Sequence, residues 1–283
     1  MRNMAKRFTR EEIKANFANV VSRHRPVLVT TAGMGLSAKF EQKGGTDMVA
    51  VSNASVLAMD GHSPVISIMP YGNANDLVLG TMKRIVSQVE AVPLMAGICA
   101  TDPTTDLVPF LKELGFYKAS AVFNTPSVGM FEGDFKRMLE RAEISYEQEV
   151  AALSEASARG FYTMGMAYTT EQAELMARAG VDAVICNFGF TIDPGEEVVA
   201  YLTEGFTAEK MQRMRRAVRA VNPEMLVLVH GGLLNSPEAA RRILADTGAA
   251  GMLLASAVER IPVQEPLMRA VQEFKNVTLE RRV

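Results

Sequence analysis

Cysteine, histidine and tryptophan are scarce in this sequence, and their scarcity excludes several kinds of site. The 283 residues include two cysteines, three histidines and no tryptophan. Cys99 and Cys186 lie far apart in apolar segments, and neither has another cysteine or a histidine at the spacing of a metal site. A disulfide framework and a cysteine-based zinc site are therefore excluded. Two buried, reduced thiols predict a cytoplasmic protein.

Long apolar runs and an excess of positive charge are absent as well. The longest apolar runs, such as GMLLASAV, are too short to span a bilayer. The N-terminal segment MRNMAKRFTREEIKANF is charged throughout and lacks the apolar centre of a secretory signal. The formal net charge is −2, which provides no electrostatic basis for binding nucleic acid or a membrane surface. We therefore expect neither kind of partner.

Two phosphate-binding motifs are also missing. No G-x-x-x-x-G-K-[ST] segment occurs, which excludes a P-loop ATPase. The glycine turn AGMG (32–35) follows the first apolar run but does not complete the G-x-G-x-x-G fingerprint of a dinucleotide-binding fold. A doubly wound open sheet is for this reason the second choice of fold.

Eight short apolar runs recur along the chain, and helical patterns lie between them. The runs are continuous rather than alternating, as in parallel strands covered on both faces. The predicted strands are 26–31, 48–53, 92–98, 119–124, 162–167, 183–189, 225–230 and 251–256. The predicted helices are 75–88, 104–114, 146–158, 171–179, 208–221, 237–247 and 266–274.

This alternation predicts a single-domain (β/α)8 barrel over residues 26–283. An extra N-terminal helix is expected within residues 1–25, because Thr9 and Glu12 have the spacing of a capping box. That helix packs either beneath the barrel or against a neighbouring molecule. Three strand-to-helix connections are long, at 54–72, 125–144 and 190–206, and the run PVISIMP (64–70) is assigned to the first of these loops. Loops of this length at the C-terminal face of a barrel commonly carry function.

Polar residues end nearly every predicted strand, so their side chains are expected to meet at the barrel mouth. His230 is the most informative, because it ends the apolar run MLVLVH and precedes a glycine pair. A histidine there suits proton transfer, although a lone histidine is as often structural. Gly231, Gly232 and Ser256 occupy the usual anion-binding position of a barrel, where simple turn chemistry is the alternative.

Other candidates have equally plain structural explanations. Asp102 is either a base or magnesium ligand or the cap of a helix that starts with Pro103. Lys39 and Glu41 are either site residues or an exposed helix pair. Tyr71 lies in the loop MPYGNAN, whose asparagines either face the mouth or cap the next helix. Cys99 lies near a strand end, but most such cysteines only pack.

Six motifs in a fixed order resemble a known family. They are GMGLSAKFEQKGGTD, MPYGNAN, GICATDP, NTPSVG, HGG and ASAVERIPV. Together they resemble the phosphoenolpyruvate hydrolase-like TIM-barrel family over residues 27–275. The resemblance implies a (β/α)8 fold related to the phosphoenolpyruvate mutase and isocitrate lyase group, self-association, and small oxoacid or enol phosphate ligands with a possible requirement for Mg²⁺. The family pattern has DAN and GVCGTDP where this chain has NAN and GICATDP, and the first change removes a carboxylate at Asn73.

The combined prediction is a hydrolase or lyase that cleaves a P–O or C–C bond in a small anionic oxoacid or enol phosphate. The alternative is a non-catalytic module that binds small anions. The predicted catalytic residues are His230, Asp102, Lys39 and Glu41. The sequence does not identify a metal, and Asp102 would be the ligand if magnesium is used. The predicted substrate-binding residues are Gly35, Ser37, Asn53, Tyr71, Asn124, Asn187, Gly231, Gly232 and Ser256.

Overall fold

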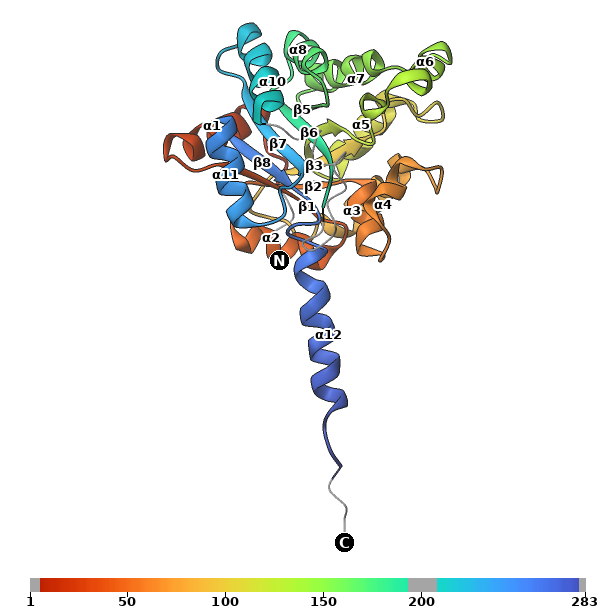
Figure 1. Cartoon of the computed structure of the whole chain (residues 1–283). Helices are drawn as coiled ribbons and strands as arrows, with labels where there is room; N and C mark the ends of the chain where they lie inside the picture. Colours follow the sequence, from red (N-terminus) through yellow and green to blue (C-terminus); the bar gives the residue numbers. More distant parts are fainter. Residues whose placement is uncertain (1–5, 193–207, 280–283) are drawn as a thin grey trace.

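Eight parallel strands close into a barrel in the order of the sequence, and β8 pairs with β1 (Figure 1). The structure is a computed structural model that describes residues 6–192 and 208–279. The prediction of a (β/α)8 barrel is confirmed, and the open sheet is wrong. The strands are β1 (Val27–Thr31), β2 (Met48–Val51), β3 (Leu94–Ile98), β4 (Ala119–Asn124), β5 (Tyr162–Ala167), β6 (Ala183–Thr191), β7 (Leu226–Gly232) and β8 (Gly251–Leu254).

Most of the described helices cover the outside of the barrel, whereas α12 (Ile261–Lys275) projects away from it (Figure 1). Each of the seven helical segments predicted from the sequence overlaps an observed helix. The longer helices are α1 (Arg10–Ser22), α4 (Ala74–Ile85), α5 (Leu107–Phe116), α7 (Tyr146–Ala158), α8 (Thr170–Arg178), α10 (Ala208–Val221), α11 (Pro237–Thr247) and α12 (Ile261–Lys275).

Parts of the chain outside the predicted helices and strands also form helices. These are α2 (Gly35–Gly44), α3 (Asn53–Met59), the 3₁₀ segments η1 (Pro64–Ile68) and η2 (Val128–Met130), and α6 (Gly133–Arg141). The connection 190–206 lies outside the described residues from 193 onward. The long connections 54–72 and 125–144 therefore contain short helices and lie at the barrel mouth.

Two apolar layers hold the barrel together. Along β1, Val27 and Val29 belong to the cluster inside the barrel, whereas Leu28 packs in the layer between strands and helices. This division follows from the two-residue period of a strand. The interior contains large side chains such as Met95, Phe123 and Met164, so the barrel is a packed core and not a channel.

Helix α1 closes the N-terminal end of the barrel. Thr9 and Glu12 form the predicted capping box at its start. Ile13 and Phe17 are fully buried in the interior cluster, and the Phe17 ring meets the ring of Tyr162 edge to face at 5.5 Å. Of the two positions predicted for this helix, the one beneath the barrel is confirmed.

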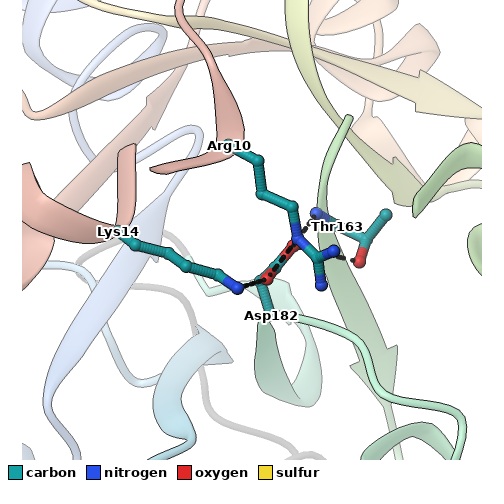
Figure 2. A network of polar contacts seen from close by, with 4 residues as sticks. All are labelled: Arg10, Lys14, Thr163 and Asp182. Atoms are coloured by element: carbon teal, nitrogen blue, oxygen red, sulfur yellow. Dashed lines mark hydrogen bonds and ion pairs between the residues drawn. The ribbon is translucent and has the colours of Figure 1, made fainter. Parts of the chain in front are cut away.

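A buried carboxylate anchors the same helix to the barrel (Figure 2). Arg10 Nε donates to Asp182 Oδ1 at 2.8 Å, and Lys14 Nζ lies 2.9 Å from the same oxygen. The Thr163 amide donates to Asp182 Oδ2 at 2.9 Å. Asp182 lies just before β6 and only 1% of its side chain is exposed, so these contacts tie α1 to β5 and β6.

Helix α12 stands away from the barrel (Figure 1). It has no buried residue, and Val263, Leu267, Val271 and Phe274 expose 46%, 66%, 63% and 81% of their surface. None of the helices described in residues 6–192 and 208–279 combines the length and apolar character of a membrane span.

Candidate functional site

A cavity opens at the C-terminal mouth of the barrel, where the strand ends converge. Its titratable and charged lining residues in the described chain include His230 from β7, and Glu259 and Arg260 from the turn after β8. Asn187 from β6 lies beside them. Hydroxyl groups dominate the rest of the polar lining, including those of Thr31, Ser52, Ser55, Ser127, Tyr168 and Ser256. Of the predicted site residues, the structure therefore brings together His230, Asn187 and Ser256.

The imidazole of His230 is held in one tautomer. Strand register pairs His230 with Leu253, and His230 Nδ1 lies 2.9 Å from the Leu253 carbonyl oxygen. Because a carbonyl oxygen only accepts, Nδ1 carries the hydrogen, and Nε2 has a free lone pair. Burial lowers the pKa of His230, against the opposing effect of the Leu253 hydrogen bond. A neutral imidazole at this position can accept a proton from a bound molecule.

Glu259 is a cavity residue that the sequence analysis missed. Its Oε1 accepts a hydrogen bond from the Gly33 amide at 2.7 Å, and Ser37 and the Met34 amide also donate to this carboxyl group. Burial raises the pKa of Glu259 to about 7, even though these hydrogen bonds act in the opposite direction. The motif ASAVERIPV contains Glu259, but it lies beyond the end of β8, where strand periodicity gives no signal.

The same carboxyl group changes the interpretation of the first loop. The sequence predicts that Gly35 and Ser37 bind a substrate anion. The N-cap Met34 of α2 makes no side-chain cap, and Glu259 instead supplies the acceptor at this helix terminus. A carboxyl group of the chain itself therefore occupies the position at this terminus where a bound anion would lie.

Gly231 and Gly232 have a packing role. Their φ angles are 82° and 58°, which favour glycine. A Cβ atom on Gly231 would lie 1.8 Å from the Gly189 carbonyl oxygen, so only glycine allows β6 and β7 to approach this closely. The structure places neither glycine in the cavity lining, and turn chemistry explains both.

Asp102 lies outside the cavity lining and forms the centre of a hydrogen-bonded cluster. Its Oδ2 accepts from Asn73 Nδ2 at 2.6 Å and from the Thr105 hydroxyl at 2.5 Å. Its Oδ1 accepts from the Thr104 amide at 2.8 Å and from the Thr104 hydroxyl at 2.7 Å. Burial alone would raise the pKa of Asp102, but the bonds from Thr105, Thr104 and Asn73 together lower it well below its usual range.

This donor set does not fit a magnesium ion. Five hydrogen bonds, from Asn73, Asn75, Thr104 and Thr105, already occupy the oxygen positions of Asp102 that a metal would need. Asn73 donates to Asp102 and brings no second carboxylate. Within residues 6–192 and 208–279, no three histidine, cysteine, aspartate or glutamate side chains gather as a metal site would require.

The structure separates Lys39 and Glu41 from the cavity lining. They lie on α2, and Lys39 faces a shallow surface depression. Glu41 points inward, and its Oε2 accepts from the Thr30 hydroxyl at 2.7 Å. Burial first, and then the nearby charge of Glu259, raises the pKa of Glu41 to about 8, against the effect of the Thr30 bond.

Three predicted substrate-binding residues also lie outside the lining. Asn53 begins α3, because Ser52 follows β2 as a helix cap, and its Nδ2 donates to the Ser67 carbonyl at 2.8 Å. Asn124 is fully buried and joins β4 to Met166 of β5. Tyr71 is 63% exposed. The two asparagines position the walls of the mouth and do not face its interior.

A buried carboxylate supports the wall next to Asn124. Glu149 on α7 accepts from Asn124 Nδ2 at 2.6 Å, from the Ser127 hydroxyl at 2.7 Å and from the Val128 amide at 2.7 Å. Ser127 lines the cavity, so Glu149 fixes one of the cavity hydroxyls.

Burial raises the pKa of the Cys99 thiol, which disfavours a reactive thiolate there.

The closed barrel, with polar strand ends around a cavity at its C-terminal mouth, defines a TIM-barrel protein whose ligand site lies at the usual face. The profile of the family described as "Phosphoenolpyruvate hydrolase-like" matches residues 12–277. The chain belongs to this family.

Two tomato proteins are similar to this chain over most of its length. The chain is 34% identical, over 263 residues, to "ToMV susceptible protein tm-1(GCR26)" and to "ToMV resistance protein Tm-1(GCR237)", both of Solanum lycopersicum. The match covers 92% of this chain but 35% of each tomato protein, so the chain spans about a third of their length.

Solved structures of the phosphoenolpyruvate mutase/isocitrate lyase superfamily share the fold. A phosphoenolpyruvate phosphomutase from Streptomyces platensis subsp. rosaceus superposes with a TM-score of 0.61 at 16% identity, covering 95% of this chain and 86% of that one. A phosphonopyruvate hydrolase, solved in complex with oxalate and Mg²⁺, superposes with a TM-score of 0.60 at 16% identity, covering 94% and 88%.

Proposed function

We propose that this chain is a lyase or hydrolase that acts on a small anionic oxoacid or enol phosphate at the barrel mouth. The observation that carries the proposal is the neutral imidazole of His230, which Leu253 holds in one tautomer in the lining of a cavity that several serine and threonine residues share. Arg260 provides positive charge for a carboxylate or phosphate in the same cavity. Family membership supports the substrate class.

The arrangement suits chemistry that passes through an enolate. His230 Nε2 can take a proton from a substrate hydroxyl or from a water molecule. The hydroxyls of Thr31, Ser52 and Ser256, with Arg260, can hold the carboxylate and the oxygen on which negative charge develops. One well-placed donor of this kind is commonly worth about 3 kcal/mol in the transition state.

A substrate panel tests the proposal. The protein is incubated with phosphoenolpyruvate, phosphonopyruvate, oxaloacetate and 2,3-dimethylmalate, and products are identified by mass spectrometry. His230→Ala is expected to lower kcat at least 100-fold with an unchanged circular dichroism spectrum, because it removes the proton acceptor. Equal turnover by wild type and variant would remove His230 from the reaction.

A second candidate is a module that binds small anions without turnover. The names of the tomato relatives describe susceptibility and resistance to ToMV and no reaction. The residues around Asp102 also do not fit a magnesium ion, whereas the solved phosphonopyruvate hydrolase contains one. Stabilisation by oxalate in a thermal-shift assay, with no product from any panel compound, would favour the module.

A further inference from the structure

We infer that Glu259 is the second proton-transfer group of the cavity and works as the acid that complements the base His230. The inference rests on the proposed function and extends it to a named pair of side chains. Both residues line the same cavity, His230 from β7 and Glu259 from the turn after the neighbouring strand β8. Neither Asp102 nor Glu41, the carboxylates expected from the sequence, lies in that lining.

The backbone links the two groups directly. The Leu253 carbonyl that orients His230 belongs to β8, and the chain then winds through a turn that carries Glu259. Within this turn the Glu259 amide donates to the Ala255 carbonyl at 3.2 Å, and the Ile261 amide donates to the Ser256 carbonyl at 2.9 Å. One short segment therefore places the hydrogen-bond partner of the base and the proposed acid.

Glu259 is held firmly enough to act at a defined position. Its Oε1 accepts from the Gly33 amide at 2.7 Å, and the residue is 4% exposed. The Met34 amide and Ser37 also donate to this carboxyl group, which further fixes its position. The raised pKa, about 7, keeps a substantial fraction of the group protonated near neutral pH.

Cleavage of a C–C bond shows how His230 and Glu259 could transfer protons with no net gain or loss. His230 Nε2 takes the proton of a hydroxyl group on the carbon that becomes a carbonyl. The adjacent C–C bond breaks, its electron pair forms an enolate on the other fragment, and Glu259 delivers its proton to the enolate carbon. The proton left on His230 returns to Glu259 through solvent, so no oxidant, reductant or other co-reactant is needed.

The groups that influence the titration of Glu259 come from three elements. Glu41 on α2 adds a neighbouring acidic group, and Ser37 on the same helix donates to the Glu259 carboxyl group. Arg260 follows Glu259 in the turn, and His230 faces the shared cavity from β7. Loss of the Ser37 hydroxyl is therefore expected to raise the pKa of Glu259, because one donor to its charged form disappears.

Proton exchange of pyruvate tests the inference without knowledge of the natural substrate. The rate at which the methyl protons of pyruvate exchange with D₂O is followed by proton NMR across a pD range of about 5 to 9, which brackets the raised pKa of Glu259 and an ordinary imidazole titration. Glu259→Gln is expected to lower the rate at least 100-fold while the oxalate-induced thermal shift remains. The introduced amide retains an oxygen that can accept from the Gly33 amide, so this variant is expected to fold.

Two further variants separate chemistry from structure. Asp182→Asn is the matched control, a buried carboxyl group at the barrel end opposite the cavity, and should exchange pyruvate within about twofold of wild type. Ser37→Ala should still exchange pyruvate, but the change in exchange rate near pH 7 should move to a higher pH. If Glu259→Gln exchanged pyruvate at the wild-type rate while His230→Ala turned over no panel compound, this inference alone would be overturned. A wild-type protein that neither exchanges pyruvate nor turns over any panel compound would overturn the proposed function and this inference together.

Discussion

Glu41 shows at the scale of one residue how burial changes the pH dependence of stability. Its carboxyl group is buried beside Thr30, and its pKa is raised to about 8. A carboxyl group whose pKa is raised in the folded state favours folding in its protonated form. Its contribution to the free energy of unfolding is therefore present below pH 4.5 and is lost as the pH rises through 8.

Glu41→Gln tests this linkage. The introduced amide stays neutral at every pH, so between about pH 5 and pH 8.5 the variant should lose less stability than wild type, by an amount on the order of 1–3 kcal/mol. Urea unfolding at the two pH values measures the difference. Wild type and variant with the same pH dependence would show that Glu41 is ionised without cost in the folded protein.

The candidate site could be predicted from the sequence only where strand ends identify it. His230, Asn187 and Ser256 end or follow apolar runs, and all three line the cavity. Asp102 and Asn124 also mark strand ends, but local hydrogen bonds turn their side chains toward the walls. Glu259 reaches the cavity through a turn, and the course of a turn is not encoded in hydrophobic periodicity.

At the scale of secondary-structure elements, the strands were predictable because they are buried on both faces. The missed helices gave weaker signals. Helix α2 starts with Gly35, and its N-terminus is capped by Glu259 from a distant turn. Helix α3 begins with a serine pair, Ser52 and Ser55, in place of the usual glutamate or glutamine at the third helical position. Helix α6 buries no residue, so no apolar face is imposed on its sequence.

The anchoring of α1 gives a prediction at the same scale. Asp182→Ala removes the acceptor shared by Arg10, Lys14 and the Thr163 amide, and leaves that amide without its partner. We expect a loss of about 2–3 kcal/mol in the free energy of unfolding. Lys14→Ala is the control and should cost less than about 1 kcal/mol, because half of the lysine side chain is exposed.

Chemical denaturation followed by circular dichroism measures both variants. Activity in the pyruvate exchange assay should be unchanged in each, because α1 closes the barrel end opposite the cavity. Equal losses of stability for the two variants would contradict a special role for the buried carboxylate.

At the scale of the whole molecule, α12 leaves apolar surface exposed. Val263, Leu267, Val271 and Phe274 recur at helical spacing and form one apolar stripe along the helix. Exposed stripes of this kind commonly mark protein–protein contacts. We therefore expect the chain to associate with further copies of itself through α12, as the family resemblance also implied.

Light scattering tests self-association. Leu267→Glu combined with Val271→Glu places two charges in the stripe and should shift the protein to the mass of a monomer. Gln272→Glu adds a charge outside the stripe and should retain the wild-type mass. A wild-type protein that is still monomeric in light scattering at about 100-fold the concentration used in the activity assays would contradict this prediction. A range of this size separates weak dimers from strong ones.

The central claim is that a small oxoacid binds in the cavity against the free nitrogen of His230. A crystal structure with oxalate measures this most directly. We predict an oxalate oxygen within hydrogen-bonding distance of His230 Nε2, with the Glu259 carboxyl group lining the same cavity. Oxalate bound instead at Asp102, or an empty cavity at saturating oxalate, would contradict the account.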